Sequence, residues 1–228
     1  MLVDFLKYLT RKKISVVFND RAASKPISSC FGTDRGTPVD RFYIEKFLAD
    51  HADLIRGRVL EIGESFYSRR LGGDQVSAFE VLHTNAANRD VTVVGDLTDQ
   101  ATLPKNAIDC FICTQTLNFI FDVHKAIEGA HYLLKPGGVI LVTVAGISQI
   151  SRYDMDRWGD YWRFTTASIV RLFQPIFTGG LEVTSFGNVL AATAFLQGIV
   201  VEDLPDPALL DDNDTDYQLV VALVAKKA

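Results

Sequence analysis

A glycine and three carboxylates stand in or directly after short apolar segments, where they could hold a nucleoside. Glu61 lies in the segment 58–62, and Gly63 directly follows it, where a glycine lets a ligand approach the backbone closely. Glu80 lies about 20 residues further on, a distance at which a carboxylate can accept hydrogen bonds from both ribose hydroxyls. Asp96 follows a third apolar segment and could accept the exocyclic amine of an adenine. Each residue alone also suits a turn or an ion pair, but their order along the chain favours a bound nucleoside.

Three further residues complete this predicted site. Leu97 would pack on the face of the adenine. Thr114 and Gln115 directly follow the apolar segment 109–113 and would face the reacting groups, because ligands bind at the carboxyl ends of parallel strands. We assign Thr114 to the cofactor and Gln115 to the substrate.

The segment 148–164 is rich in aromatic and arginine side chains, which suit a sugar ring, a planar ring or an anionic group. Its candidate substrate contacts are Arg152, Tyr153, Trp158 and Trp162. Arg35 and Tyr43, from a turn and the helix after it, are further candidates, in a lid that would close over the site. The alternative is that 148–164 forms a loop held in place by its own aromatic side chains.

No residue is assigned as a catalytic base or a metal ligand. Three of the four histidines fall in predicted helices, and His83 lies near the expected cofactor edge rather than the reacting group. Cys110 and Cys113 have a spacing that could serve metal or redox chemistry. They lie in a predicted strand, however, where residues three apart face opposite sides. We therefore expect both cysteines to be structural.

Strands alternate with helices along the chain, and this pattern predicts an α/β fold with a doubly wound, mostly parallel sheet. The last strand follows a long connection and has no helix after it, so it is expected to run antiparallel to the others. The predicted helices are 39–55, 66–71, 123–134, 166–177 and 189–197, with a short amphipathic helix at the start of the chain. The seven predicted strands are 58–62, 76–82, 91–94, 109–113, 139–144, 181–185 and 218–225.

The charge and the apolar content of the chain indicate which kinds of ligand or partner it can bind. The 228 residues carry a formal net charge of −5 without a basic cluster, which argues against nucleic acid and leaves a small molecule. No apolar run reaches the roughly 20 residues that span a bilayer, and the first residues do not resemble a signal peptide. We expect one cytoplasmic domain over 1–228, with a helical or lid segment at 1–55 and a core at 56–228. The oligomeric state is left open.

The motifs LEIGES (60–65), GDL (95–97) and the segment 107–144, which contains LLKPGG, resemble the class I S-adenosylmethionine-dependent methyltransferases, type 11-like. The resemblance covers about 59–144 and implies a Rossmann-like fold and S-adenosyl-L-methionine as cofactor. It matches Glu61 and Gly63 to the first motif, Glu80 to the ribose acid, and Asp96 with Leu97 to the adenine pair. The segments 28–48 and 160–165 are similar to a bacterial subgroup associated with glycan and glycosyltransferase pathways. The implied activity is methylation of a small polar molecule, such as a sugar or a glycan-pathway metabolite.

The first turn departs from this family, because Ser65 and Tyr67 stand where further glycines are usual. Bulkier residues there could crowd the methionine half of the cofactor. One alternative is therefore a methyltransferase-fold protein that binds or scaffolds without catalysis. Another is a nicotinamide-dependent oxidoreductase, but the turn lacks the G-x-G-x-x-G pattern that such enzymes need.

Overall fold

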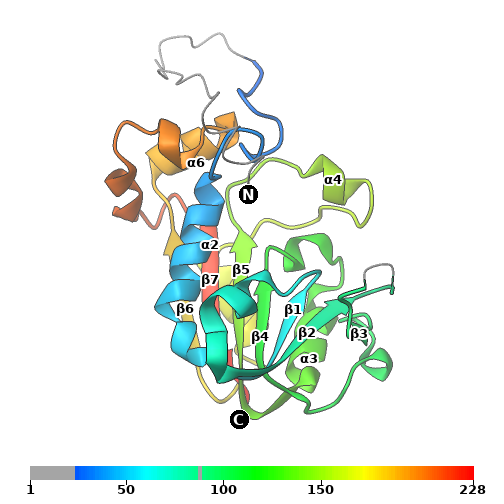
Figure 1. Cartoon of the computed structure of the whole chain (residues 1–228). Coiled ribbons are helices and arrows are strands. Elements are labelled where there is room, and N and C mark those ends of the chain that lie inside the picture. The colour runs from blue at the N-terminus through cyan, green and yellow to red at the C-terminus, as the bar shows by residue number, and fades with distance from the viewer. Residues whose placement is uncertain (1–23, 87–88) are drawn as a thin grey trace.

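The computed structural model describes residues 24–86 and 89–228, and the predicted helix at the start of the chain lies outside them. A seven-stranded sheet runs through the molecule in the order β3-β2-β1-β4-β5-β7-β6 (Figure 1). β7 is antiparallel to both of its neighbours, and the other paired strands are parallel. The predicted seven-stranded, mostly parallel fold with an antiparallel last strand is confirmed. The strands are β1 (Gly57–Ile62), β2 (Val76–His83), β3 (Val93–Val94), β4 (Ile108–Thr114), β5 (Leu134–Ala145), β6 (Leu181–Phe186) and β7 (Val220–Lys226).

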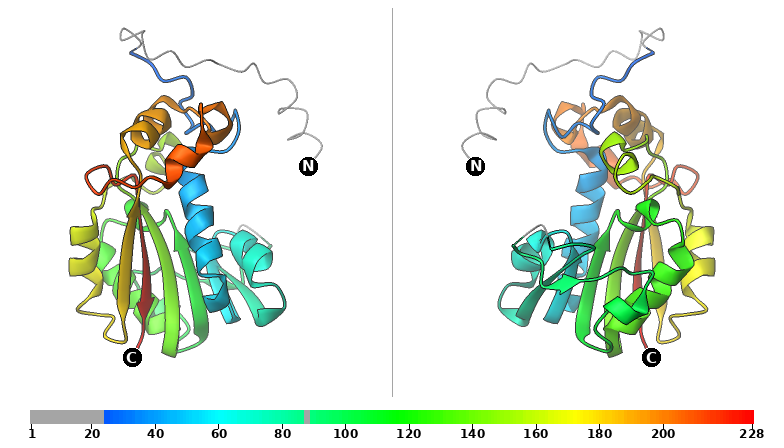
Figure 2. Two further views of the ribbon diagram at one scale, coloured as in Figure 1. Left: turned by 90° about the vertical axis from the view of Figure 1, so that its left-hand side faces the viewer. Right: turned by 90° about the vertical axis from the view of Figure 1, so that its right-hand side faces the viewer.

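Helices cover both faces of the sheet, as Figure 2 shows for α5 and α2 on opposite sides. One core lies under α3 (Val123–Leu133) and α5 (Thr166–Phe173), and the other lies under α2 (Val39–Asp50) and α6 (Val189–Gln197). The start of α2 and the short helix α4 (Arg152–Met155) gather beyond the carboxyl ends of the parallel strands (Figure 1). That edge of the sheet is where ligands bind in this class of fold.

Some elements end elsewhere than the sequence predicts. The segment 66–71 begins with a short turn and becomes a π-helix over Ser68–Gly72. β5 begins at Leu134, because the segment 134–138, which the sequence pattern marks as a helix end, already joins the sheet. No helix in the described part of the chain is long and apolar enough to cross a membrane.

Cys110 and Cys113 lie on opposite faces of β4, in the two separate cores, as expected from their spacing. Burial raises the pKa of each thiol to about 12. Thiols held protonated in this way are poor nucleophiles and poor metal ligands. Among residues 24–86 and 89–228, no group of three or more histidine, cysteine or acidic side chains could hold a metal ion.

The loop that carries Asp96 and Leu97 rests directly on α3, and a glycine makes this contact possible. A Cβ atom added at Gly129 would lie 2.0 Å from the backbone oxygen of Leu97. Neither the helix nor the loop can move away freely, because Leu97 is itself buried in the core. The absence of a side chain at Gly129 therefore allows the loop with Asp96 and Leu97 to pack closely against α3.

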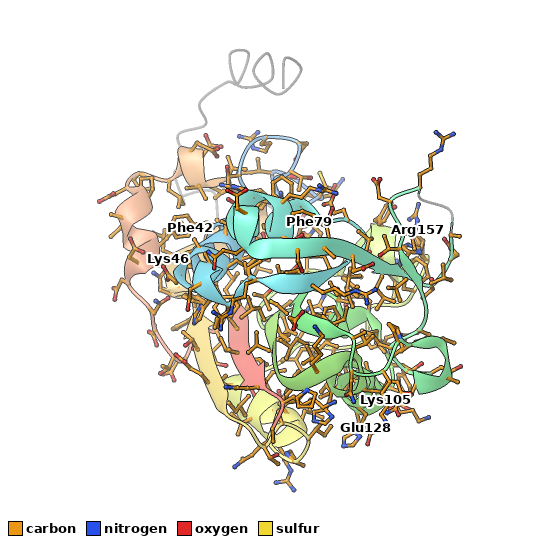
Figure 3. All side chains as sticks on the ribbon, turned by 60° about the horizontal axis from the view of Figure 1, so that its bottom comes forward. Phe42, Lys46, Phe79, Lys105, Glu128 and Arg157 are labelled. Atoms are coloured by element: carbon orange, nitrogen blue, oxygen red, sulfur yellow. The ribbon has the colours of Figure 1, made fainter. Side chains whose placement is uncertain are left out.

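We expect Gly129→Ala to lower the free energy of unfolding by about 1–3 kcal/mol, the usual cost of overpacking. Urea denaturation followed by circular dichroism measures this change. Glu128→Ala is the matched control, since Glu128 lies on the outer side of the same helix (Figure 3) and should change stability by no more than about 0.5 kcal/mol. Equal stability of the two variants would contradict the close contact between loop and helix.

Candidate functional site

Two hollows lie side by side at the carboxyl edge of the sheet. The first, of ≈ 570 Å³, we call the apolar groove, and the second, of ≈ 410 Å³, the polar hollow. The apolar groove is lined by the ends of four strands and by the loop 148–164, including Ile62, Gly63, His83, Asp96, Leu97 and Trp158. The polar hollow is lined by the start of α2, the first turn and the same loop, including Asp40, Glu64, Tyr67, Thr114, Asp160 and Arg163. Gln115, Phe119 and Asp154 line both, and we call these three residues the junction.

The carboxylate of Glu61 holds the first turn in place rather than facing a ligand. Glu61 is 4% exposed and accepts hydrogen bonds from the backbone N–H groups of Tyr67 at 3.0 Å and Ser68 at 2.6 Å. Burial raises the pKa of this carboxyl, and the hydrogen bonds from Ser68 and Tyr67 offset only part of that effect. Glu61 therefore fixes the path of the chain as it leaves β1.

Gly63 places a residue without a side chain at the edge of the apolar groove. Its φ of +79° lies in the left-handed region, and no heavy atom of the described residues lies within 4 Å of the position that a Cβ would take. A ligand can therefore approach the main chain there, as the sequence predicts.

The two residues that replace glycines in the first turn do not line the apolar groove. Ser65 accepts a hydrogen bond from Nε of Arg69 at 2.9 Å. Tyr67 packs beside the core under α2 and lines the polar hollow. Tyr67 thus shapes the neighbouring hollow instead of filling the groove.

Asp96 and Leu97 both line the apolar groove, as the sequence predicts. Oδ1 of Asp96 accepts hydrogen bonds from the N–H and the hydroxyl of Thr98, each at 2.8 Å. These bonds fix the orientation of the carboxylate at the groove wall. Leu97 is 4% exposed, so its contact with a ligand would add little further burial.

Glu80 does not line the apolar groove, so the structure gives no support to the ribose role predicted from its spacing. It lies within β2, opposite Leu60, and its Oε1 accepts a hydrogen bond from Nε of Arg58 at 2.8 Å. The strand continues past Glu80 and ends at His83, which lines the groove in its place. The ring of His83 meets Trp158 edge to face, with the centroids 5.9 Å apart. From the sequence, His83 is expected near the cofactor edge but is given no role in binding.

Thr114 and Gln115 follow one another at the end of β4, but they line different spaces. Thr114 lines the polar hollow and not the groove, so it does not lie with Asp96 and Leu97 as the cofactor assignment expects. Gln115 has a φ of +47°, and its Nε2 is buried without a hydrogen-bond partner. A strained backbone and an unpartnered buried donor are both features that cluster at functional sites.

Of the four candidate substrate contacts in 148–164, Trp158 is the one that lines a hollow. Arg152 does not line them, and Tyr153 is 67% exposed with the guanidinium of Arg157 stacked on its ring. Nε1 of Trp162 donates to the backbone oxygens of Ile120 at 3.1 Å and Phe121 at 3.2 Å. For Trp162 the alternative explanation therefore holds, because its ring ties the loop to the segment after β4.

Arg35 and Tyr43 do not line the hollows either, and each is held by a distant part of the chain. Nη2 of Arg35 forms an ion pair with Asp203 at 2.9 Å. Tyr43 is fully buried and stacks on Phe186, with the ring centroids 5.5 Å apart. It belongs to the face of α2 that packs on the sheet, so it cannot act in a lid.

Charged side chains make the second hollow polar. Although burial opposes ionisation, hydrogen bonds from Arg163 and from the N–H of Ser151 hold the pKa of Asp160 below its usual value. Arg163 also donates to the backbone oxygen of Gln149 at 2.6 Å, so this ion pair closes the loop 148–164 on itself. Burial raises the pKa of Asp40 to about 6, and the N–H of Arg41 at 2.8 Å offsets only part of the effect.

The residues present fit an adenine nucleoside with an extended chain. The groove has the volume of a typical cofactor site, which is roughly 300–1,000 Å³. It offers a residue without a side chain at Gly63, a fixed carboxylate at Asp96 and apolar side chains between them. The departure from expectation is Glu80, which is absent from the lining of the groove, while His83 lines it.

Comparison with known proteins adds a family match. Residues 57–142 match the family model described as a methyltransferase domain. The mouse protein named arginine-hydroxylase NDUFAF5, mitochondrial, is 26% identical over 148 residues, which are 64% of this chain and 36% of the mouse protein. The chain thus spans about a third of the length of the curated relatives that it matches.

Solved structures share the fold at low sequence identity. The cyclase SpnF superposes with a TM-score of 0.54 at 17% identity, over 85% of this chain and 84% of SpnF. A SAM-dependent methyltransferase from Archaeoglobus fulgidus superposes with a TM-score of 0.53 at 11% identity, over 82% of this chain and 94% of that one. Together with the strand order, these likenesses show that the chain has the Rossmann-like fold of the class I S-adenosylmethionine-dependent methyltransferases.

Proposed function

We propose that this protein is an S-adenosylmethionine-dependent methyltransferase that acts on a small polar molecule, such as a sugar. One observation carries the proposal: the apolar groove, which suits the nucleoside, meets the polar hollow, which suits an acceptor, at the junction of Gln115, Phe119 and Asp154. The methyl group would pass from one ligand to the other at this junction. The match of 57–142 to a methyltransferase domain supports the same assignment.

Positioning is the main task that such a reaction leaves to the protein. When bound, the cofactor supplies a methyl group on a sulfonium, which is already an activated leaving group. Holding two reactants in line can contribute roughly 7–11 kcal/mol to the lowering of the barrier. Here Asp96 and Gly63 would orient the nucleoside, while the loop closed by Arg163 would fix the acceptor and exclude water.

If the apolar groove binds the cofactor, Asp96 should contribute to the binding affinity and Glu80 should not. We expect Asp96→Ala to weaken S-adenosylhomocysteine binding by about 1.5–3 kcal/mol, the range for a hydrogen bond to a charged group. Glu80→Ala should leave the affinity nearly unchanged, because Glu80 pairs with Arg58 and does not line the groove. Isothermal titration calorimetry on both folded variants measures the difference. The reverse pattern of losses would restore the ribose role to Glu80.

The path of the first turn predicts that both the nucleoside and the methionine half of the cofactor find contacts. Because Tyr67 lies beside the polar hollow, the groove should have room for the methionine half as well as the nucleoside. We expect the wild-type protein to bind S-adenosylhomocysteine at least about tenfold more tightly than adenosine, a difference of about 1.4 kcal/mol. Titration with both ligands, and with NAD as a control that should not bind, gives the measurement. Equal affinity for adenosine would support the non-catalytic alternative.

A further inference from the structure

The polar hollow carries an excess of negative charge. Its lining contains four carboxylates and two guanidinium groups: Asp40, Glu64, Asp154, Asp160, Arg41 and Arg163. Asp160 and Arg163 neutralise one another through two contacts, at 2.5 Å and 3.0 Å. Three carboxylates therefore remain against the single guanidinium of Arg41. An acceptor that enters this hollow meets a field that favours a cation.

Asp154 brings one of these carboxylates to the junction. It is half-buried, and it lines both the polar hollow and the apolar groove. Its Oδ2 accepts the hydroxyl of Ser151 at 2.5 Å, and no ion pair joins it to a basic side chain of residues 24–86 or 89–228. The carboxylate is thus held in place by a neutral hydroxyl rather than by a basic side chain.

Gln115 supplies an independent observation at the same point. Its Nε2 is buried without a partner, although a buried amide donor normally finds one. Its backbone N–H donates to the oxygen of Thr143 at 2.7 Å, which holds the residue in its left-handed conformation. Gln115 and Asp154 both line the two hollows, and among residues 24–86 and 89–228 this amide donor has no partner, so an oxygen atom of a ligand that reaches it would satisfy it.

The placement of the carboxylates favours an organic cation over a metal ion. Asp40, Glu64 and Asp154 belong to three separate segments, and within the described part of the chain they do not converge into a metal-binding group. A divalent cation needs several oxygen ligands around one point. A molecule the size of a monosaccharide can instead reach carboxylates on different walls of a hollow of ≈ 410 Å³.

We propose that the polar hollow binds an acceptor of monosaccharide size that carries a protonated amine and a neighbouring hydroxyl. The ammonium group lies against Asp154, and the hydroxyl oxygen accepts a hydrogen bond from Nε2 of Gln115. The proposal rests on the methyltransferase function and names the class of its acceptor, an amino sugar or a similar amino alcohol.

Three hexoses of nearly equal size but different charge provide the test. Glucosamine, glucose and glucuronate are titrated at pH 7 into protein saturated with S-adenosylhomocysteine. We expect glucosamine to bind at least about tenfold more tightly than the other two, as for a hydrogen-bonded charge pair. Equal or tighter binding of the neutral or the anionic sugar overturns the proposal, and so does the absence of glucosamine binding.

Two variants locate the binding. Asp154→Asn keeps the size and the contact with Ser151 but removes the charge, and it should weaken glucosamine binding roughly tenfold. Gln115→Asn suits the left-handed backbone but shortens the reach of the amide, so it should weaken glucosamine binding while leaving the unfolding midpoint unchanged or higher. Asp74→Asn, which removes an exposed charge outside both hollows, is the matched control and should bind glucosamine like the wild type. Wild-type affinity for glucosamine in Asp154→Asn would overturn the proposal.

The same titrations separate this inference from the proposed function. If the wild-type protein does not bind S-adenosylhomocysteine, the methyltransferase assignment itself fails. If it binds S-adenosylhomocysteine but prefers the neutral sugar, the assignment stands and only the amine class is wrong.

Discussion

The buried carboxylate of Glu61 is the constraint on which the site depends. It accepts two backbone N–H groups from the turn that follows β1, at Tyr67 and Ser68. Without this acceptor two buried donors would lose their partner, at a cost of about 1–3 kcal/mol for each unsatisfied group. The bonds pull the chain back toward the sheet directly after Gly63. They leave space on the Cβ side of Gly63 among the described residues and place Tyr67 beside the polar hollow.

Close backbone contacts fix the other walls in the same way. Gly146 follows β5, and a Cβ there would lie 2.0 Å from the backbone oxygen of Gln218. The start of the loop 148–164 is thus pinned to the chain entering β7, as the loop with Asp96 is pinned to α3 by Gly129. At its other end the loop is tied by Arg163, which bonds to Asp160 and to the backbone oxygen of Gln149. The walls of both hollows are therefore fixed mainly by close contacts of the backbone. Substitution of exposed side chains would not change the position of these walls.

Sequence reasoning found the fold and the residues that directly follow strands. The strands contain apolar runs, and the carboxyl ends of parallel strands must meet at one edge, so Gly63, Asp96 and Leu97 could be placed in advance. The surroundings of Glu80 could not, because they depend on strand register. Arg58, which pairs with Glu80, lies on the neighbouring strand. Arg35 and Tyr43 were misplaced for a similar reason, since their partners lie more than 100 residues away in the chain.

The charge of the polar hollow could not be predicted from the segment 148–164 alone. The segment 148–164 is rich in arginine and aromatic residues, which suggested an anionic or planar ligand. In the folded chain Arg163 is neutralised by Asp160, and the aromatic rings of Tyr153 and Trp162 contact protein groups outside the hollow. Carboxylates from the start of α2 and from the first turn then join Asp154 around the same space. The sign of the charge around the polar hollow is thus opposite to that suggested by the loop alone, because it depends on which charges pair with one another and which face the hollow.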